Sequence, residues 1–248
     1  MDYQGIVADA KHIKVLSKPD RFVKISARED RSELPFKTWE TLLNNTTLQT
    51  WKGIILSKGI AEIGIYPMIL WELKPKTIIE LGAFNGGSAV WLADNLEILG
   101  VDGSVYSIDI DLSLLDEKAK YHPRVNFIEG DVNNLNAVLP KTMLDQLPHP
   151  WLIIEDSHVN VLAVVNHFHN NGITSGDYLI VEDTNKLMWE FQGEQWSDEE
   201  ENVHGRQKMS DLRSWLLNHE DEYLIDTHYQ DMYGYNVSKN WNSILKRF

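Results

Sequence analysis

The sequence predicts one α/β domain built on a doubly wound, mostly parallel β-sheet. Short runs rich in Ile and Val, such as TIIELGAF (77–84) and WLIIEDSH (151–158), alternate with helical stretches of roughly a dozen residues. Right-handed crossovers between parallel strands place helices on both faces of such a sheet. The 248 residues contain neither repeats nor a linker, and 43% of them are apolar, which is enough for one sizeable core.

The elements follow from apolar spacing and from the residues at their ends. Before the alternation begins, 36–45 and 63–75 predict two helices, and Pro75 ends the second. Five strands are expected in the alternating region, at 77–84, 104–111, 124–132, 151–158 and 177–184. The helices between them are expected at 86–99, 114–122, 134–146 and 161–171. A helix at 209–220 and two closing strands at 223–236 and 240–247 complete the prediction.

Two segments do not follow the alternation. Residues 1–35 are mixed and charged without a clear period, and we interpret 1–50 as an N-terminal extension before a domain at 51–248. Residues 185–205 carry the aromatic side chains of Trp189, Phe191 and Trp196 beside a run of acids. A long irregular insert next to a sheet end is often a lid or substrate loop, and a plain surface loop fits this pattern equally well.

Composition excludes several classes of function. The formal net charge of −14, from 37 acidic and 23 basic residues, argues against a nucleic-acid partner held by counterion release. The absence of cysteine excludes disulfides and thiolate metal sites. The N-terminus lacks the pattern of a signal peptide, and no apolar run approaches the ~20 residues of a membrane span. We therefore expect a soluble, cytoplasmic protein without a membrane partner.

Acidic residues gather where the five predicted strands end. In an open α/β sheet, ligands bind beyond the carboxyl ends of the strands, near the point where the strand order reverses. A buried carboxylate is costly unless it is paired, hydrogen-bonded or bound to a metal, so this concentration exceeds what core packing needs. The residues in question are Glu80, Asp109, Asp131, Glu155, Asp156, Glu182 and Asp183.

A glycine-rich turn follows the first of these strands. Gly82, Gly86 and Gly87 allow the backbone to approach a ligand, and Ser88 can cap the next helix or donate to that ligand. Together with Glu80 they form the pattern E-x-G-x-x-x-G-G-S, which is neither the dinucleotide fingerprint nor the phosphate loop. A plain tight turn is the alternative interpretation of the glycines alone.

The next two strand ends narrow the choice of ligand. Asp109 lies about 20 residues beyond the glycines, where an acid can hold both hydroxyls of a ribose. Asp131 follows the third strand, where it can meet the edge of an adenine. A ribose and an adenine without phosphates indicate S-adenosylmethionine, whose positive sulfonium also suits acidic surroundings.

The fourth and fifth strand ends predict a metal site. Asp156, Glu182 and Asp183 can supply hard oxygen ligands, for which Mg²⁺ is the natural cation. His158 can then take a proton from a substrate hydroxyl that the metal has acidified. Helix capping is the alternative role for the aspartates, and a structural role is the alternative for His158. Glu155 competes with Asp156 as the metal ligand because both closely precede the histidine.

The stretches ILWELKPKTIIELGAFNGGSAVWLAD, IIEDSH and DYLIVEDTN resemble the cephalosporin hydroxylase family, and the resemblance runs from about Trp51 to YGYNVSKNWNSILKR. Despite its name, the family resembled has the class I S-adenosylmethionine-dependent methyltransferase fold and includes relatives of macrolide and rhamnosyl O-methyltransferases. The resemblance implies a Rossmann-like, seven-stranded sheet, mostly parallel with an antiparallel last strand. It also implies assembly as a homo-oligomer.

The resemblance further implies which residues hold the ligands. S-adenosylmethionine would contact Gly82, Gly86, Ser88, Asp109 and Asp131, and Mg²⁺ or another divalent cation would be held by matches to Asp156, Glu182 and Asp183. One departure is the short D-S-H spacing, since relatives often place one or two more residues between the acid and the histidine. A loop shortened there would move Glu155 into the ligand position.

The function expected from these observations is Mg²⁺-dependent O-methylation of a small-molecule natural product, such as a secondary metabolite or a sugar. His158, or one of the acids, would remove the proton from the acceptor hydroxyl. Two alternatives stay open. A hydroxylase would require two histidines and a carboxylate around iron, and a non-catalytic module would keep only cofactor binding.

Overall fold

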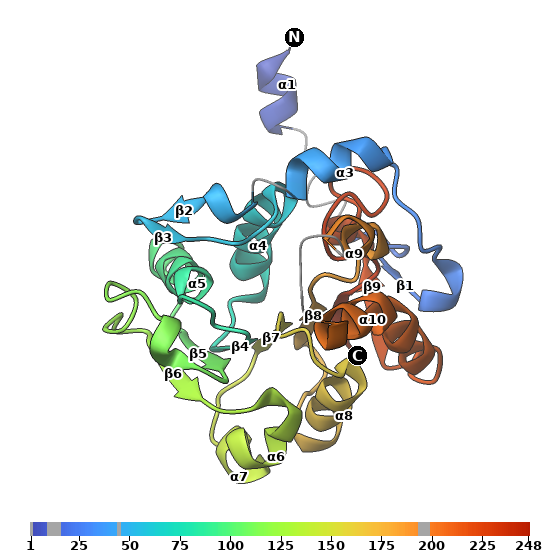
Figure 1. The fold of residues 1–248 in the computed structure, drawn as a ribbon. Coiled ribbons are helices and arrows are strands. Elements are labelled where there is room, and N and C mark those ends of the chain that lie inside the picture. The colour runs from blue at the N-terminus through green and yellow to red at the C-terminus, as the bar shows by residue number, and fades with distance from the viewer. Residues whose placement is uncertain (1, 9–15, 44–45, 193–198) are drawn as a thin grey trace.

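The computed structural model describes residues 2–8, 16–43, 46–192 and 199–248. An eight-stranded sheet in the order β1-β9-β10-β8-β7-β4-β5-β6 forms its centre (Figure 1). Its strands are β1 (Phe22–Val23), β4 (Thr77–Leu81), β5 (Ser104–Asp109), β6 (Val125–Glu129), β7 (Trp151–Glu155), β8 (Tyr178–Val181), β9 (Tyr223–Asp226) and β10 (Ile244–Arg247). A separate hairpin consists of β2 (Thr50–Trp51) and β3 (Ile54–Ile55).

The predicted fold class is confirmed. Strands β8, β7, β4, β5 and β6 run parallel, and β10 lies antiparallel between β8 and β9. The strand count differs from the expected seven because β1 pairs antiparallel with β9 at the edge. Arg21, just before β1, explains this addition, since its buried guanidinium bonds to Asp226 at the end of β9.

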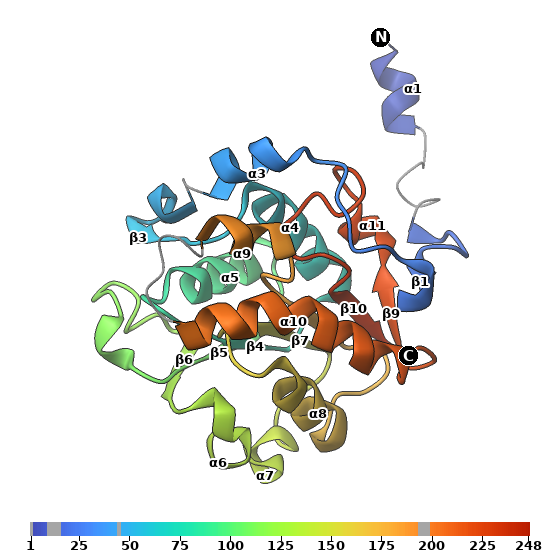
Figure 2. The same ribbon diagram turned by 45° about the vertical axis from the view of Figure 1, so that its right-hand side comes forward.

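Helices cover both faces of the sheet (Figure 2). The longer ones are α3 (Phe36–Leu43), α4 (Ile60–Leu73), α5 (Gly87–Ile98), α8 (Val161–Asn171), α9 (Lys186–Gln192) and α10 (Glu199–Leu217). The shorter ones are α1 (Tyr3–Ala8), α6 (Leu135–Val138), α7 (Lys141–Leu144) and α11 (Thr227–Gln230). In the described part of the chain, no helix has the length and apolar character needed to cross a membrane.

The central strands contribute side chains to two hydrophobic cores, one on each face of the sheet, because successive side chains of a strand point to opposite faces. In β4, Ile78 packs with α4 and α5, whereas Ile79 and Leu81 pack with α8 and α10. Every residue of β4 and β7 is buried, as expected for central parallel strands covered on both sides. These two strands therefore form a rigid base for the loops that follow them.

Several predicted elements were wrong in type or extent. The helix expected at 114–122 is absent: the short 3₁₀ helix η3 (Leu112–Leu114) ends where it was expected to begin, and the polar segment that follows buries only Leu115 and Ala119. The helix expected at 134–146 divides into α6 and α7 at Pro140, since proline disfavours helical backbone in the residue before it.

The C-terminal predictions also need correction. The strand expected at 223–236 ends at Asp226, whose side chain accepts a hydrogen bond from the His228 N–H and caps α11. The strand expected at 240–247 begins only at Ile244. The insert expected to be irregular at 185–205 contains α9 and the start of α10.

Candidate functional site

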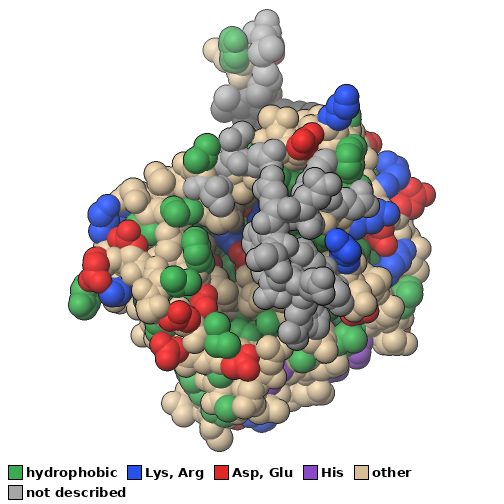
Figure 3. Space-filling view, viewed as in Figure 1, with side chains coloured by type: hydrophobic (Ala, Val, Ile, Leu, Met, Phe, Trp, Pro, Cys, Tyr) green, Lys and Arg blue, Asp and Glu red, His purple; other side chains and the backbone are tan. Residues whose placement is uncertain are grey.

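A cavity of about 540 Å³ opens at the carboxyl ends of β4, β5, β7 and β8. Strand β4 pairs with β5 on one side and with β7 on the other, so the strand order reverses next to β4. The cavity therefore lies at the switch point of the sheet. Hydrophobic and acidic side chains gather around the hollow on this face of the molecule (Figure 3). The location agrees with the prediction made from the strand ends.

Two glycines bring the walls of the cavity together. Gly82 has a φ of +103°, and a Cβ at this position would lie 2.2 Å from the carbonyl oxygen of Asp156. Gly87 opens α5, and its Cβ would lie 1.8 Å from the carbonyl oxygen of Ile55. The glycine-rich turn therefore lets β7 and the β3 hairpin approach the end of β4 more closely than a side chain would permit.

The predicted cofactor residues divide into two groups. Gly82, Ser88, Asp109 and Asp131 line the cavity, whereas Gly86, Gly87 and Glu80 do not belong to its lining. Glu80 is fully buried at the end of β4 and accepts a hydrogen bond of 2.6 Å from the Ser107 hydroxyl. Burial raises the pKa of Glu80. It lies within β4, the strand that precedes the turn.

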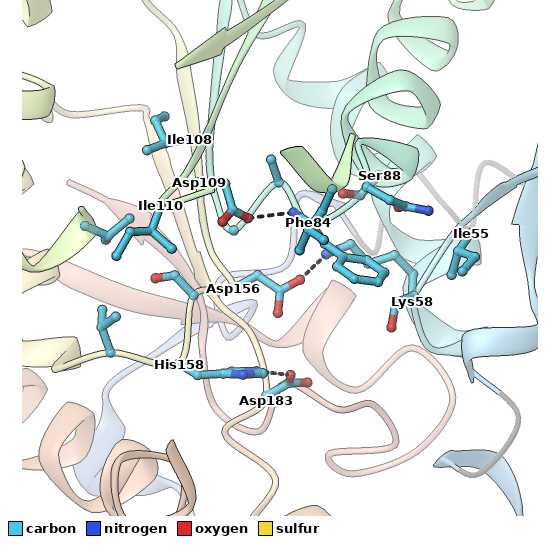
Figure 4. A pocket seen from close by; sticks show the side chains of 18 of the residues that line it. Ile55, Lys58, Phe84, Ser88, Ile108, Asp109, Ile110, Asp156, His158 and Asp183 are labelled. Atoms are coloured by element: carbon cyan, nitrogen blue, oxygen red, sulfur yellow. Dashed lines mark hydrogen bonds and ion pairs between the residues drawn. The ribbon is translucent and has the colours of Figure 1, made fainter. Parts of the chain in front are cut away.

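Asp109 holds the glycine-rich turn in position. Its Oδ2 accepts a hydrogen bond of 2.7 Å from the Phe84 N–H (Figure 4), and its Oδ1 accepts one of 3.2 Å from the Asp111 N–H. Asp131 accepts from the Asn133 N–H at 2.8 Å and caps a short turn. Both carboxylates also line the cavity, so capping and ligand contact are compatible roles for them.

Left-handed backbone recurs around the cavity. Phe84, His158 and Asp183 have φ values of 47°, 50° and 58°, and all three line it. They follow β4, β7 and β8 in turn. Such conformations cost free energy for residues other than glycine and tend to persist at functional sites, where the surrounding structure enforces them.

His158 and Asp183 form a hydrogen-bonded pair inside the cavity (Figure 4). The Nε2 atom of His158 lies 3.0 Å from Oδ2 of Asp183, and the ring of Trp189 packs edge-on against the imidazole at 5.1 Å. Candidate ligand atoms of Asp156, His158 and Asp183 all lie within 4.8 Å of one another. The structure therefore brings the predicted base and two predicted metal ligands together.

The acids at 155 and 156 face different surroundings. Asp156 lines the cavity, whereas Glu155 is fully buried with its Oε2 2.6 Å from Nζ of Lys208 on α10. The alternation of side chains along a strand accounts for this difference. The geometry favours Asp156 over Glu155 as a cavity ligand.

Two buried lysines in the site were missed from the sequence. Nζ of Lys58 lies 2.7 Å from Oδ2 of Asp156 and 2.8 Å from Oε1 of Glu182. Nζ of Lys239 lies 2.8 Å from Oδ1 of Asp183. Lys239 falls within the C-terminal stretch that carried the family resemblance, whereas Lys58 had no comparable signal beyond its place just before a helix.

These lysines and acids shift one another's pKa values. Burial acts to lower the pKa of Lys58, but the carboxylates of Asp156 and Glu182 outweigh it and hold that pKa well above its usual range. Burial and the neighbouring Asp156 raise the pKa of Glu182 to about 8. Burial alone would raise the pKa of Asp183, yet Lys239 and His158 hold it well below the usual range.

The donor set has the chemistry of a hard-cation site. Glu182 is fully buried and does not line the cavity, and Tyr66 and Lys58 both donate to its Oε1. Its Oε2 is buried and makes no hydrogen bond within the described part of the chain. Glu182 does not belong to the group formed by Asp156, His158 and Asp183, but it shares the Lys58 ammonium with Asp156. Its orphaned carboxylate oxygen fits a divalent cation that prefers oxygen ligands.

Of the three aromatic residues expected to form a lid, the structure describes the side chain of Trp189. Trp189 is fully buried, and its indole N–H donates a 2.8 Å hydrogen bond to the carbonyl oxygen of Asp183. It packs with Trp39 and Met188, and of these Met188 lines the cavity. The Phe191 side chain and Trp196 lie outside the described residues.

The parallel sheet with an antiparallel β10 and a cavity at its switch point define a class I methyltransferase fold. The family model described as rhamnosyl O-methyltransferase/CmcI matches residues 44–248. The chain belongs to this family, which confirms the resemblance stated from the sequence.

The chain is similar to curated and solved relatives. It is 34% identical over 145 residues to a rhamnosyl O-methyltransferase of Mycobacterium leprae, a match that covers 57% of this chain and 62% of that protein. A Mycobacterium tuberculosis rhamnosyl O-methyltransferase is 30% identical over 143 residues, covering 56% of this chain and 58% of that protein. The chain thus covers less than two thirds of the length of these curated relatives.

Solved CmcI structures match nearly the whole chain. An apo-structure of CmcI-N160 has a TM-score of 0.63 and 26% identity and covers 96% of this chain and 95% of that one. A structure of CmcI-D160 with Mg and SAM has a TM-score of 0.63 and 25% identity and covers 97% and 96%.

Proposed function

We propose that this protein is an S-adenosylmethionine-dependent O-methyltransferase that modifies a hydroxyl of a small-molecule natural product, such as a sugar-bearing one. The observation that carries the proposal is one cavity in which Asp109 and the glycine-rich turn face Asp156, His158 and Asp183. Cofactor-binding chemistry and acid–base chemistry thus share a single space. The rhamnosyl O-methyltransferase relatives and the CmcI structure with Mg and SAM support it.

The two sides of the cavity would have different tasks. Asp109 and Asp131 would bind the ribose and the adenine, and Gly82 would let the backbone lie against the rest of the cofactor. S-adenosylmethionine supplies the methyl group. The rim of the cavity adds apolar side chains from Ile55, Ile110 and others, which suit an acceptor that carries an apolar part.

The other side would prepare the acceptor hydroxyl. Asp156, Glu182 and Asp183 would hold Mg²⁺, which lowers the pKa of a bound hydroxyl when it is present. His158 would accept the hydroxyl proton, and its hydrogen bond to Asp183 would keep the imidazole oriented. Holding the two reactants in line is the larger part of the catalysis that this chain would contribute.

The other functions considered from the sequence have less support. A non-haem iron hydroxylase needs two histidines, but His158 is the single histidine among the described residues that line the cavity. A non-catalytic module would bind the cofactor without transferring a methyl group. Assembly as a homo-oligomer and a cytoplasmic location stay predictions.

Titration of S-adenosylmethionine by calorimetry, in Mg²⁺ and then in EDTA, tests the proposal. We expect micromolar binding that weakens at least about tenfold in Asp109→Ala, because a ribose-binding carboxylate is lost. Asp111→Ala is the matched control, since Asp111 caps a neighbouring turn and does not line the cavity. Transfer of labelled methyl groups to rhamnose-bearing acceptors then separates an enzyme from a binding module. Absence of cofactor binding in both buffers contradicts the proposal.

A further inference from the structure

Lys58 lies between two of the acids that would hold the metal. Its ammonium contacts Asp156 at the end of β7 and Glu182 at the end of β8, and its side chain is 1% exposed. Figure 4 shows Lys58 reaching the Asp156 carboxylate from the opposite wall of the cavity. Tyr66, on the helix that begins just after Lys58, donates to the same Glu182 oxygen.

Acidic groups outnumber the ammonium groups in this cluster. The carboxyl groups of Asp156, Glu182 and Asp183, all buried or nearly buried, face the ammonium groups of Lys58 and Lys239. A buried ionised carboxylate is very costly without a counterion, so Lys58 stabilises the fold when no metal is bound.

A divalent cation needs the same oxygens. A metal on Asp156 and Glu182 would lie within a few ångströms of the Lys58 ammonium, and the side chains of Lys58 and Glu182 are both buried. Two positive charges at such a distance repel strongly where the effective dielectric is low. The carboxylates thus gain little from holding both partners in the present arrangement.

We propose that Lys58 is an internal counterion that takes the place of the divalent cation and competes with it for Asp156 and Glu182. This inference rests on the metal site proposed above. Lys58 keeps the metal-free site folded and at the same time weakens metal binding. Metal loading therefore requires the Lys58 ammonium to give up contacts with at least one of the two carboxylates.

The test compares two buried lysines that differ in position. Lys208 is also 1% exposed and lies 2.6 Å from the buried Glu155, but it does not line the cavity and, among the described residues, forms an ion pair with neither Asp156 nor Glu182. Its charge still acts on Asp183. Mg²⁺ affinity is measured by calorimetry, and thermal unfolding is followed with and without Mg²⁺, for wild type, Lys58→Met and Lys208→Met. Both substitutions leave a buried carboxylate without its ammonium partner.

We expect Lys58→Met to bind Mg²⁺ at least about tenfold more tightly than wild type, because a repelling charge is removed. Its Tm should fall in EDTA and recover in Mg²⁺. Lys208→Met should also lose Tm, but Mg²⁺ should restore no more than the shift seen for wild type. Lys58→Gln, which keeps a hydrogen-bond donor without the charge, should behave like Lys58→Met.

Equal or weaker Mg²⁺ binding by both neutral Lys58 variants overturns the inference and leaves the proposed metal site standing. Failure of both variants to fold even in Mg²⁺ also overturns it, because the cation could not then replace the lysine. Absence of Mg²⁺ binding in wild type and in every variant instead contradicts the metal site itself.

Discussion

The imidazole of His158 and the carboxylate of Asp183 meet across the ends of two neighbouring strands, with Nε2 3.0 Å from Oδ2. Both residues have left-handed backbone, and Trp189 packs against the imidazole while its N–H donates to the Asp183 carbonyl. The pair is thus held by its backbone, by an aromatic ring and by its own hydrogen bond. A fixed, oriented imidazole is what a general base requires.

Replacing His158 tests this role. We expect His158→Gln to lower kcat for methyl transfer by about 100- to 10,000-fold, because general-base catalysis is lost. Cofactor binding, measured by calorimetry, should stay unchanged. His169→Gln is the control, since His169 lies on α8 and does not line the cavity. A His158→Gln enzyme with wild-type kcat would show that another group takes the proton.

Gly82 tests the close approach of β4 and β7. Gly82 and Gly176 have similar φ values of +103° and +100°, but a Cβ on Gly176 would meet nothing within 4 Å. Gly176→Ala should therefore cost only the strain of left-handed backbone, about 1–2 kcal/mol in the free energy of unfolding. Gly82→Ala should lose a further amount of about 1–3 kcal/mol, since the Asp156 backbone must move. Denaturant unfolding measures both, and equal losses would contradict the steric argument.

Arg21 tests whether the N-terminal segment is part of the fold. Its guanidinium makes paired hydrogen bonds to Glu72 and bonds to Asp226, which is fully buried. Arg21→Met should lower the free energy of unfolding by about 3–5 kcal/mol, because a buried charge loses its partner. Lys24→Met is the matched control, since the Lys24–Asp221 pair is exposed to water and should contribute nothing measurable. Equal stabilities of the two variants would show that the buried Arg21 ion pairs do not anchor the segment that leads into β1.

The free energy of unfolding is expected to depend on pH through the imidazole of His167. Burial lowers its pKa below the usual 6.5, although a hydrogen bond to the Leu139 carbonyl opposes the shift. Below pH 6.5 the unfolded chain takes up a proton at this residue that the folded chain accepts only at lower pH. Stability should therefore fall as the pH drops through this range, because the unfolded state binds more protons.

The variant His167→Gln keeps a donor to Leu139 and removes the titration. Its free energy of unfolding, measured by denaturant titration between pH 7 and 5, should fall less steeply than that of wild type. His169 and His228 also have pKa values lowered first by burial, so part of the slope should persist. Identical slopes for the two proteins would exclude His167 as a contributor.

The sequence by itself determined the sheet and the edge where the site lies. Apolar runs such as 151–158 mark buried strands, and parallel strands bring their carboxyl ends together, so Asp109, Asp156 and Asp183 were expected to meet. The spacing of Gly82, Gly86 and Gly87 after the first of these strands also predicted the glycine-rich turn. These features depend on neighbours along the chain, which is why the sequence was sufficient to predict them.

Only the tertiary structure decided whether Glu155 or Asp156 faces the cavity. It also decided which buried lysine forms an ion pair with each of these acids. Asp156 lines the cavity while Glu155 binds Lys208 across the fold. Lys58 reaches Asp156 from 98 positions away, and β1 joins the sheet through Arg21 at a separation of 205. Such ion pairs leave no periodic signal in the sequence, because their energy depends on burial and distance rather than on local spacing.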